Sequence, residues 1–338
     1  MERTSWESRL SHRQVKTRLQ AVQEIAGSKD PARMPLLLRA LQDRSNFVVA
    51  AAARGLSTSP SQQAIEPLMQ RFRWLDEKGK TRDATCAARI AIIPALVACE
   101  AAEAGDLYLR AIRTVQIEPS GMGVEDVAIP LRIEAATALA TFRIPGTLLA
   151  LAILLVDASP VARAAAATAL EYLGDPGAVA VLGMRLARPG AEEPEVLVAC
   201  MDALVNLDAD AALQLVSPFL ESTDPYLVAG AATALARLGQ SYHEKVLVLL
   251  EEACDRTAAQ AREAVILAIA SMRSDATAVS LSRLANHHEA AVRLATVMAL
   301  EQRADAESER LLRELAARTT DRQVSRAAKE VLQRLAQS

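Results

Sequence analysis

Aromatic side chains are scarce in this sequence. Two Trp, four Tyr and four Phe make up 3% of its 338 residues, although 51% of the residues are hydrophobic. Sheets favour β-branched and aromatic residues, so a core this poor in aromatics favours close-packed helices. The 13 Gly and 14 Pro fall mostly between apolar segments, where they punctuate helices. The composition therefore indicates an all-helical protein.

Long apolar runs and paired cysteines are missing as well. The longest apolar run, residues 148–156, has nine residues, whereas a helix needs about 20 to span a bilayer. Residues 1–6 lead into an amphipathic segment rather than a secretory leader. Cys86, Cys99, Cys200 and Cys254 have no C-x-x-C spacing, so we expect buried, reduced thiols. We expect a soluble, cytoplasmic protein, and its wealth of alanine and arginine indicates a bacterial one.

The sequence does contain a repeated motif, an Ala-Leu pair in the middle of alanine-rich segments. The second residue of this pair, or of a looser copy, gives ten anchor residues: Val22, Leu56, Leu96, Leu139, Leu170, Leu204, Leu235, Ile269, Leu300 and Leu332. Neighbouring anchors are 31 to 43 residues apart, and a period of roughly 20–50 residues marks a repeat architecture. The small residue before each anchor predicts close contact between helices of neighbouring repeats.

One unit shows how a repeat is built. A helix over Pro160–Leu173 is closed by Gly174, and Asp175-Pro176 opens a second helix that ends near Ala187. Each repeat is therefore a pair of helices. We predict a right-handed superhelix of about nineteen or twenty helices, with no strand pairing beyond chance.

Two further residue types recur at fixed distances from the anchors. Asp lies thirteen residues before the anchor at Asp43, Asp83, Asp126 and Asp157, and Arg lies seven before it at Arg89, Arg132, Arg163, Arg262 and Arg293. This turn Asp, helix Arg and small-residue-Leu core resemble HEAT repeats, particularly the HEAT-like units of phycobilin lyases. The resemblance implies an all-α fold, an α–α superhelix (HEAT-like solenoid) of about ten helix pairs.

The resemblance also implies a structural ladder between successive repeats. That role is expected of Asp83, Arg89, Asp126, Arg132, Asp157 and Arg163. Val49, Leu197 and Val228 replace the Arg in three repeats, so we expect the ladder to be interrupted there.

Charge is unevenly distributed along what we expect to be a single solenoid over residues 1–338. The N-terminal repeats, residues 1–99, carry 16 Lys and Arg against 9 Asp and Glu, a net charge of +7. The central repeats, residues 100–260, carry 10 against 22, or −12, and the C-terminal capping repeats, residues 261–338, carry 12 against 10, or +2. Such asymmetry bears on the choice of partners rather than on the fold.

Motifs for catalysis are not apparent. The sequence has no phosphate-binding loop and no nucleophile elbow. Deoxyhypusine hydroxylases, which share the repeat type, hold iron with four His-Glu pairs, whereas this sequence has only His243-Glu244 and His288-Glu289, at different phases. We therefore expect no catalytic residue, metal or cofactor. A phycobilin-lyase-like or hydroxylase-like enzyme stays an alternative that rests on repeat type alone.

Nucleic-acid binding is another alternative, because basic residues gather around one tryptophan in the N-terminal repeats. The patch consists of Arg71, Arg73, Trp74, Lys78, Lys80 and Arg82, and phosphate contact needs such a density of Lys and Arg. HEAT-like alkylpurine glycosylases use a basic groove in this way. The acidic central repeats would, however, repel a duplex that lay along them.

The surface that we expect to bind a partner follows from helix geometry. In HEAT-like solenoids the second helices line the concave face, and residues two before and two after each anchor point away from the buried stripe, because two residues turn a helix by about 200°. These positions hold Thr137, Thr141, Thr168, Tyr172, Asp202, Asn206, Thr233 and Arg237, followed by Leu267 and Ser271. We predict a non-enzymatic scaffold that binds a basic protein or peptide there.

Two intervals between anchors are longer than the rest. The interval of 40 residues contains the segment 76–83, and the interval of 43 residues contains the segment 118–126. Insertions in solenoids map to loops on one face, and long loops often carry function. A tolerated surface insertion is the alternative for both segments.

Overall fold

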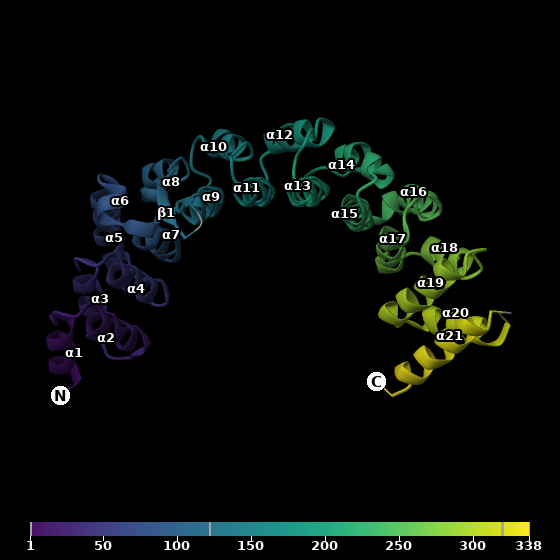
Figure 1. Ribbon diagram of the computed structural model, residues 1–338, viewed down its shortest axis with the longest axis horizontal. Helices are drawn as coiled ribbons and strands as arrows, with labels where there is room; N and C mark the ends of the chain where they lie inside the picture. Colours follow the sequence, from purple (N-terminus) through teal and green to yellow (C-terminus); the bar gives the residue numbers. More distant parts are fainter. Residues whose placement is uncertain (1, 122, 319–320, 338) are drawn as a thin grey trace. The chain divides into compact units, whose positions relative to one another are not determined.

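A computed structural model of the protein describes residues 2–121, 123–318 and 321–337. Within these residues the chain forms twenty-one α-helices, four short 3-10 helices and two β-strands, as Figure 1 shows. In the part of the chain that the structure describes, none of the helices is both long and apolar enough to cross a membrane. The predicted all-α fold, an α–α superhelix, is confirmed, with the two strands as its one exception in the described residues.

The chain divides into two compact units, Met1–Leu173 and Gly174–Ser338. The first unit contains α1 (Glu2–Leu10), α2 (Val15–Gly27), α3 (Arg33–Ala40), α4 (Asn46–Ser57), α5 (Gln62–Asp76), α6 (Gly79–Arg82), α7 (Ala87–Ala98), α8 (Gly105–Ala111), β1 (Ile117–Ser120), β2 (Gly123–Asp126), α9 (Ile129–Phe142), α10 (Thr147–Leu154) and α11 (Pro160–Leu173).

The second unit contains α12 (Pro176–Ala187), α13 (Pro194–Leu207), α14 (Ala209–Val216), α15 (Pro225–Ala236), α16 (His243–Arg256), α17 (Ala259–Ser271), α18 (Asp275–Ala285), α19 (Ala290–Arg303), α20 (Ala306–Arg318) and α21 (Arg322–Leu335). The 3-10 helices are Ala84–Cys86 and Ala102–Ala104 in the first unit, and Ser217–Glu221 and Gln240–Tyr242 in the second.

Within each unit the helices form two layers. One layer consists of the helices that carry the anchor residues, here called anchor helices, and each packs on the next: α2, α4, α7, α9 and α11 in the first unit, and α13, α15, α17, α19 and α21 in the second. The intervening helices form the other layer. In the first unit, the anchor helices α4, α7, α9 and α11 lie on the inner side of the bend (Figure 1).

Local signals place the helix ends where the sequence predicts them. In the unit that served as reference, α11 spans Pro160–Leu173, Gly174 has a φ of 61°, and α12 spans Pro176–Ala187. The Asp175 side chain accepts a hydrogen bond from the Gly177 amide and so caps α12. Glycine is favoured at position 174 because it adopts the left-handed conformation without a steric penalty.

The core consists of small and aliphatic side chains, as the composition predicts. Nine of the ten anchors have no exposed surface, and the exception is Leu332 near the end of α21. At Gly55, the residue before an anchor lies in a close contact between neighbouring anchor helices. At Gly55, an added Cβ atom would lie 2.9 Å from Cβ of Ala26 on the preceding anchor helix.

The first repeat requires a correction of register. Arg18 on α2 is 3% exposed and pairs with Asp43, as the ladder arginines do. Seven residues after Arg18 lies Ile25, which is fully buried. Ile25, rather than Val22, is therefore equivalent to the other anchors, which shortens the first interval to 31 residues.

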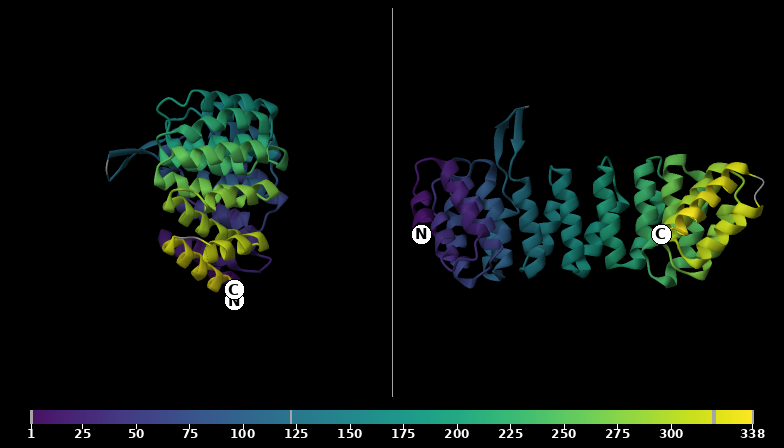
Figure 2. Two further views of the ribbon diagram at one scale, coloured as in Figure 1. Left: turned by 90° about the vertical axis from the view of Figure 1, so that its right-hand side faces the viewer. Right: turned by 90° about the horizontal axis from the view of Figure 1, so that it is seen from below.

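Among the described residues strands pair at one place, where the sequence predicted no pairing beyond chance. Strands β1 and β2 form an antiparallel hairpin in which Ile117 faces Asp126 and Ser120 faces Gly123. The hairpin projects beyond the helices of the first unit (Figure 2). It accounts for the insertion that was identified as the segment 118–126, of which residue 122 lies outside the described residues.

Candidate functional site

The exposed face of the anchor helices carries the residues that were predicted to bind a partner. Thr137, Thr168, Tyr172, Asn206, Thr233 and Arg237 are exposed, and Thr141 and Asp202 are partly exposed. Thr137, Thr141, Thr168 and Tyr172 belong to the first unit, and the other four belong to the second. We call these eight residues the binding strip. The structure thus places each predicted residue at the surface, within its own unit.

The threonines of the binding strip bond to their own helices. The hydroxyl of Thr168 donates to the carbonyl of Ala164 at 3.3 Å, and that of Thr233 donates to the carbonyl of Ala229 at 2.8 Å. Thr137 and Thr141 bond in the same way to the carbonyls four residues before them. With the hydroxyl proton used internally, each Thr presents its methyl group and acceptor lone pairs to a partner.

Arg237 is engaged with the neighbouring anchor helix in the second unit. Its guanidinium group donates to Asp202 Oδ1 at 2.8 Å and to Asn206 Oδ1 at 3.0 Å. The side chains of Arg237 and Asp202 are 44% and 39% exposed, so this pair contributes little stability. Its effect is to hold three members of the binding strip in one arrangement across α13 and α15.

The sequence interpretation missed the large residues at the start of this exposed face. Phe47, Val161 and Tyr226 each lie nine residues before an anchor and are 52%, 62% and 51% exposed. Positions nine, five and two before the anchor and two after it follow the i, i+4, i+7, i+11 spacing of a single helix face. Because this spacing extends the strip by two turns, it is the signal that would have found these residues.

Small residues occupy the middle of the same face. Five residues before the anchor lie Ala165 on α11 and Gly230 on α15. A Cβ atom added at Gly230 would lie 2.4 Å from Cγ2 of Val198 on α13. The exposed face of α15 therefore lacks a side chain at Gly230, between Tyr226 toward the start of the helix and Thr233 and Arg237 toward its end.

Several residues of the basic patch that was predicted to bind nucleic acid make contacts within the protein. Arg71 is only 6% exposed, and its guanidinium group donates to the carbonyl of Asp43 at 2.6 Å. Burial lowers the pKa of Arg71 from its usual value, an effect that Asp43 and Asp83 oppose. Arg71 therefore cannot reach a phosphate group, which corrects its assignment to the patch.

Trp74 is 41% exposed and lies beside two arginines. The Cζ atoms of Arg71 and Arg82 are each 4.2 Å from the centre of its ring, within the range of cation–π contacts. Arg82 also bonds to the carbonyl of Trp74 and to Glu77. Lys80 donates to the carbonyl of Ile117 at 3.2 Å. The remaining members of the patch, Arg73 and Lys78, are exposed.

The ladder residues contact one another between repeats. Arg132 is 2% exposed; its Nη1 atom lies 2.7 Å from Asp126 Oδ2, and its Nε atom lies 2.9 Å from Asp157 Oδ2 in the next repeat. Each of these aspartates also accepts a backbone amide two residues ahead, that of Ala128 and of Ser159. The Asp therefore shapes the turn before one helix and binds the Arg of the preceding repeat.

The ladder differs from the prediction at both ends. Arg18 pairs with Asp43 in the first unit, and in the second Arg262 pairs with Glu289 and Arg293 with Asp321. Glu289 and Asp321 lie eleven rather than thirteen residues before their anchors, which is why the fixed spacing missed them.

The ladder is bridged at one of the positions where an interruption was expected. In the repeat that has Val49 in place of the arginine, the side-chain amide of Asn46 donates to Asp83 Oδ1 at 3.2 Å and to the carbonyl of Ala84 at 2.6 Å. The neutral side chain of Asn46 thus replaces a ladder arginine.

The two insertions meet in a buried polar network around Arg89. This arginine is 1% exposed and binds Asp83, which has no exposed surface, at 3.1 Å, and Asp76 at 3.0 Å. It also donates to the side chain of Gln116, which precedes the hairpin. On the hairpin, Glu118 accepts the amide of Thr85 at 3.0 Å. Segment 76–83 and the hairpin therefore hold each other in place.

We expect the ladder to weaken in acid. Burial alone would raise the pKa of the Asp126 carboxyl, but hydrogen bonds from the amides of Gln116 and Ala128 and from Arg132 hold that pKa below its usual value. A carboxylate whose pKa is lower in the folded state stabilises the fold above its unfolded pKa of about 3.9, and this contribution is lost as the pH falls below that value. Urea unfolding from about pH 5 down to about pH 3 should show a shallower loss of stability for Asp126→Asn than for the parent. Equal slopes would contradict this.

Residues with metal-binding or nucleophilic chemistry are dispersed. In residues 2–121, 123–318 and 321–337, no three His, Cys, Asp or Glu side chains are grouped so that they could hold a metal ion. His243 begins α16, whereas His288 lies between α18 and α19. All four cysteines are buried and unpaired, and burial raises the pKa of the Cys86, Cys200 and Cys254 thiols to about 12.

Comparison with known proteins identifies the repeat. The sequence profile of HEAT repeats matches residues 4–99 and 188–270, which together are more than half of the chain. No curated protein sequence matches this one.

Comparison with known structures gives matches at low sequence identity. Kap121p bound to Pho4p is 14% identical, with a TM-score of 0.57 over 99% of this chain and 41% of Kap121p. A homology model of the AP-3 complex is 12% identical, with a TM-score of 0.53 over 98% of this chain and 68% of that one. The phycocyanin lyase complex of CpcE and CpcF from Nostoc sp. PCC7120 is 20% identical, with a TM-score of 0.38 over 91% and 97%. The likenesses to Kap121p and to the AP-3 complex concern the fold alone.

Proposed function

Because the chain belongs to the HEAT-repeat family, we propose that it is a non-enzymatic scaffold that binds a protein or peptide partner on the exposed face of its anchor helices. The observation that carries the proposal is the composition of that face. Small residues and Thr methyl groups alternate there with exposed large side chains such as Tyr172 and Tyr226. Tyrosine is enriched among the residues that dominate binding energy at interfaces.

The charge of the central repeats supports a basic partner. Residues 100–260 carry a net charge of −12, and a field of one sign accelerates the approach of an oppositely charged ligand. Asp202 and Asn206 keep a fixed geometry through Arg237, which we therefore consider a positioning residue. Each unit carries its own part of the binding strip.

We expect Tyr172→Ala and Tyr226→Ala each to weaken the binding of a partner, isolated with the parent protein from native cells, by about 1 kcal/mol or more. Matched controls are Leu149→Ala in the first unit and Val248→Ala in the second, because both side chains are well exposed but lie on intervening helices. The controls should bind like the parent. Association should also slow as salt is raised, because the Debye length is about 8 Å at physiological ionic strength.

The nucleic-acid alternative places the binding surface on the basic patch instead of the binding strip, and it is tested together with the scaffold proposal. Charge reversal at Arg73, Lys78 and Lys80 should leave partner binding unchanged. If the protein instead binds a DNA duplex tightly in a gel-shift titration, and these three reversals abolish the binding, the scaffold proposal is wrong.

A further inference from the structure

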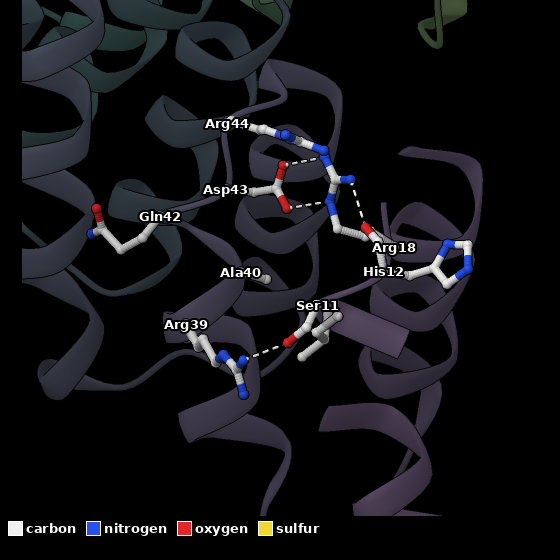
Figure 3. A pocket seen from close by; sticks show the side chains of 9 residues that line it. Ser11, His12, Arg18, Arg39, Ala40, Gln42, Asp43 and Arg44 are labelled. Carbon is white, nitrogen blue, oxygen red and sulfur yellow. Dashed lines mark hydrogen bonds and ion pairs between the residues drawn. The ribbon is translucent and has the colours of Figure 1, made fainter. Parts of the chain in front are cut away.

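The first unit has a polar cavity in its N-terminal repeat, lined by residues of the loops that follow α1 and α3. Its charged residues do not converge on one point. Asp43 accepts a hydrogen bond from Arg18 Nε at 2.7 Å, so this pair is neutral, and Arg39 and Arg44 lie on opposite sides of Ala40 (Figure 3). A cavity in the second unit is built differently.

This second cavity, of about 320 Å³, lies between α17 and α19, two anchor helices that pack on each other. On α19 its wall consists of Ala291, Leu294, Ala295 and Met298. Three of them lie nine, five and two residues before the anchor Leu300, the positions that form the exposed face of the other anchor helices. The cavity therefore lies on the face that we propose to bind a partner, outside the eight residues of the binding strip.

The α19 wall is apolar and adaptable. Spacings of three and four residues align its four side chains along one side of the helix. Met298 is 48% exposed, and a methionine side chain adjusts its shape to different apolar partners. Since a cavity of about 150 Å³ already admits a benzene ring, this one has room for a leucine or phenylalanine side chain.

The α17 wall consists of Ala259, Arg262 and Glu263. The guanidinium group of Arg262 donates to Glu289, which directly precedes α19, and to the carbonyl of Thr257 at 3.1 Å. This ladder pair joins the two walls near the start of both helices, and it matches the charge of Arg262.

Glu263 is left as the unmatched charge of the cavity. Its side chain is exposed, and among the described residues it forms no ion pair. The residues three and four positions away on α17 are Ala259, Gln260, Ile266 and Leu267, so no neighbour along the helix supplies a cation. A ligand that places a positive charge beside the apolar cavity is therefore favoured, and one with a negative charge is repelled.

We propose that this cavity receives a leucine or phenylalanine side chain of a basic peptide segment, and that Glu263 pairs with a lysine or arginine beside it in that segment. The inference rests on the proposed function and specifies what the partner presents to the exposed face. Apolar contact supplies the affinity, and the exposed ion pair supplies mainly selectivity. The anionic head of a lipid or fatty acid would lie beside Glu263, which argues against such an occupant.

The test is a nuclear magnetic resonance titration of the full-length protein, with isotopically labelled methionine methyl groups, by the capped peptide Gly-Lys-Leu-Lys-Gly. We expect the signal of Met298, assigned with Met298→Leu, to shift with a dissociation constant of about 1 mM or lower. Met184 is the internal control, because it is 69% exposed on the intervening helix α12 and its signal should not move. Gly-Lys-Ala-Lys-Gly, which lacks the apolar side chain, should bind about tenfold more weakly, and Gly-Glu-Leu-Glu-Gly should also bind more weakly because Glu263 repels it.

Ala291→Trp should fill the cavity from α19 and lower the affinity for the leucine peptide about tenfold or more, whereas Glu263→Gln should lower it about two- to fivefold. Both altered side chains are exposed, so thermal melting should show that the variants remain folded. The matched controls are Ala180→Trp on α12 and Glu244→Gln on α16, because both replace exposed residues of intervening helices in the same unit. They should bind like the parent.

The proposal is overturned if the Met298 signal does not respond to the leucine peptide, if it responds equally to the alanine peptide, or if Ala291→Trp binds like Ala180→Trp. A Met298 signal that shifts with protein concentration alone would identify a second copy of the chain as the occupant and overturn it as well. Loss of the native partner in Tyr226→Ala without a peptide at Met298 would refute this inference and leave the proposed function standing. Peptide binding at Met298 without any effect of Tyr226→Ala on the partner would refute the binding strip instead.

Discussion

Replacing Arg89 by alanine should lower the free energy of unfolding by about 3–5 kcal/mol, the largest effect that we expect of any single substitution here. The reason is the burial of its partners rather than the number of its contacts. Asp83 has no exposed surface, and without Arg89 its charge would be left in the interior. Gln116 would lose its bond to the arginine as well, so the hairpin should loosen with the ladder.

Urea unfolding followed by circular dichroism measures this change. Arg113→Ala is the control, since Arg113 is an exposed arginine of the same unit, and it should change the free energy of unfolding by less than about 0.5 kcal/mol. Arg89→Lys should lie between the two, because lysine keeps the charge but not the planar fork that reaches Asp83 and Asp76 together. A melting curve of Arg89→Ala that matched the parent would show that the network is not structural.

The periodic part of the fold could be predicted from the sequence because its signals are local. Helices α11 and α12 begin at prolines and are separated by a glycine in the left-handed conformation, and each of these residues acts within one turn of the chain. The register of the first repeat is different. Val22 and Ile25 are three residues apart on one helix face, so both fit the apolar stripe, and only the contact of Arg18 with Asp43, 25 residues away, distinguishes them.

The hairpin could not be predicted because its stabilising contacts are distant in the sequence. Gln116 bonds to the carbonyl of Asp83, and Glu118 bonds to the amide of Thr85, each 33 residues away. Its strands are only four residues long and mostly exposed, so they lack the apolar alternation that marks a half-buried strand. Two insertions that are separate in the sequence therefore form one structure.

The sequence predicts which residues of the candidate binding surface are exposed, but not which of them pair with one another. A rotation of about 200° over two residues places positions such as Thr168 and Thr233 at the surface, and the structure has them there. The pairing of Arg237 with Asp202 depends on the distance between α13 and α15. Similarly, the sequence does not show that Arg71 is buried whereas other basic residues around Trp74 are exposed.

Replacing Gly55 by leucine should lower the free energy of unfolding by about 3 kcal/mol, because the close contact between α2 and α4 leaves no room for a side chain. Already a Cβ atom would lie 2.9 Å from Ala26 Cβ and 3.1 Å from Leu37 Cδ2. Ala26 is part of a helix and cannot move alone, so the two anchor helices must separate. The smaller substitution Gly55→Ala should also destabilise, although alanine favours helix over glycine by about 1 kcal/mol.

Gly27 near the end of α2 provides the matched control. A Cβ atom added there would meet no atom within 4 Å, so Gly27→Ala should keep a gain in helix propensity of up to about 1 kcal/mol. Chemical denaturation should therefore give opposite signs for the same substitution at positions 27 and 55. If Gly55→Ala stabilised the protein as Gly27→Ala does, the position before the anchor would not lie in a tight contact between helices, and the small residue that recurs there would need another physical reason.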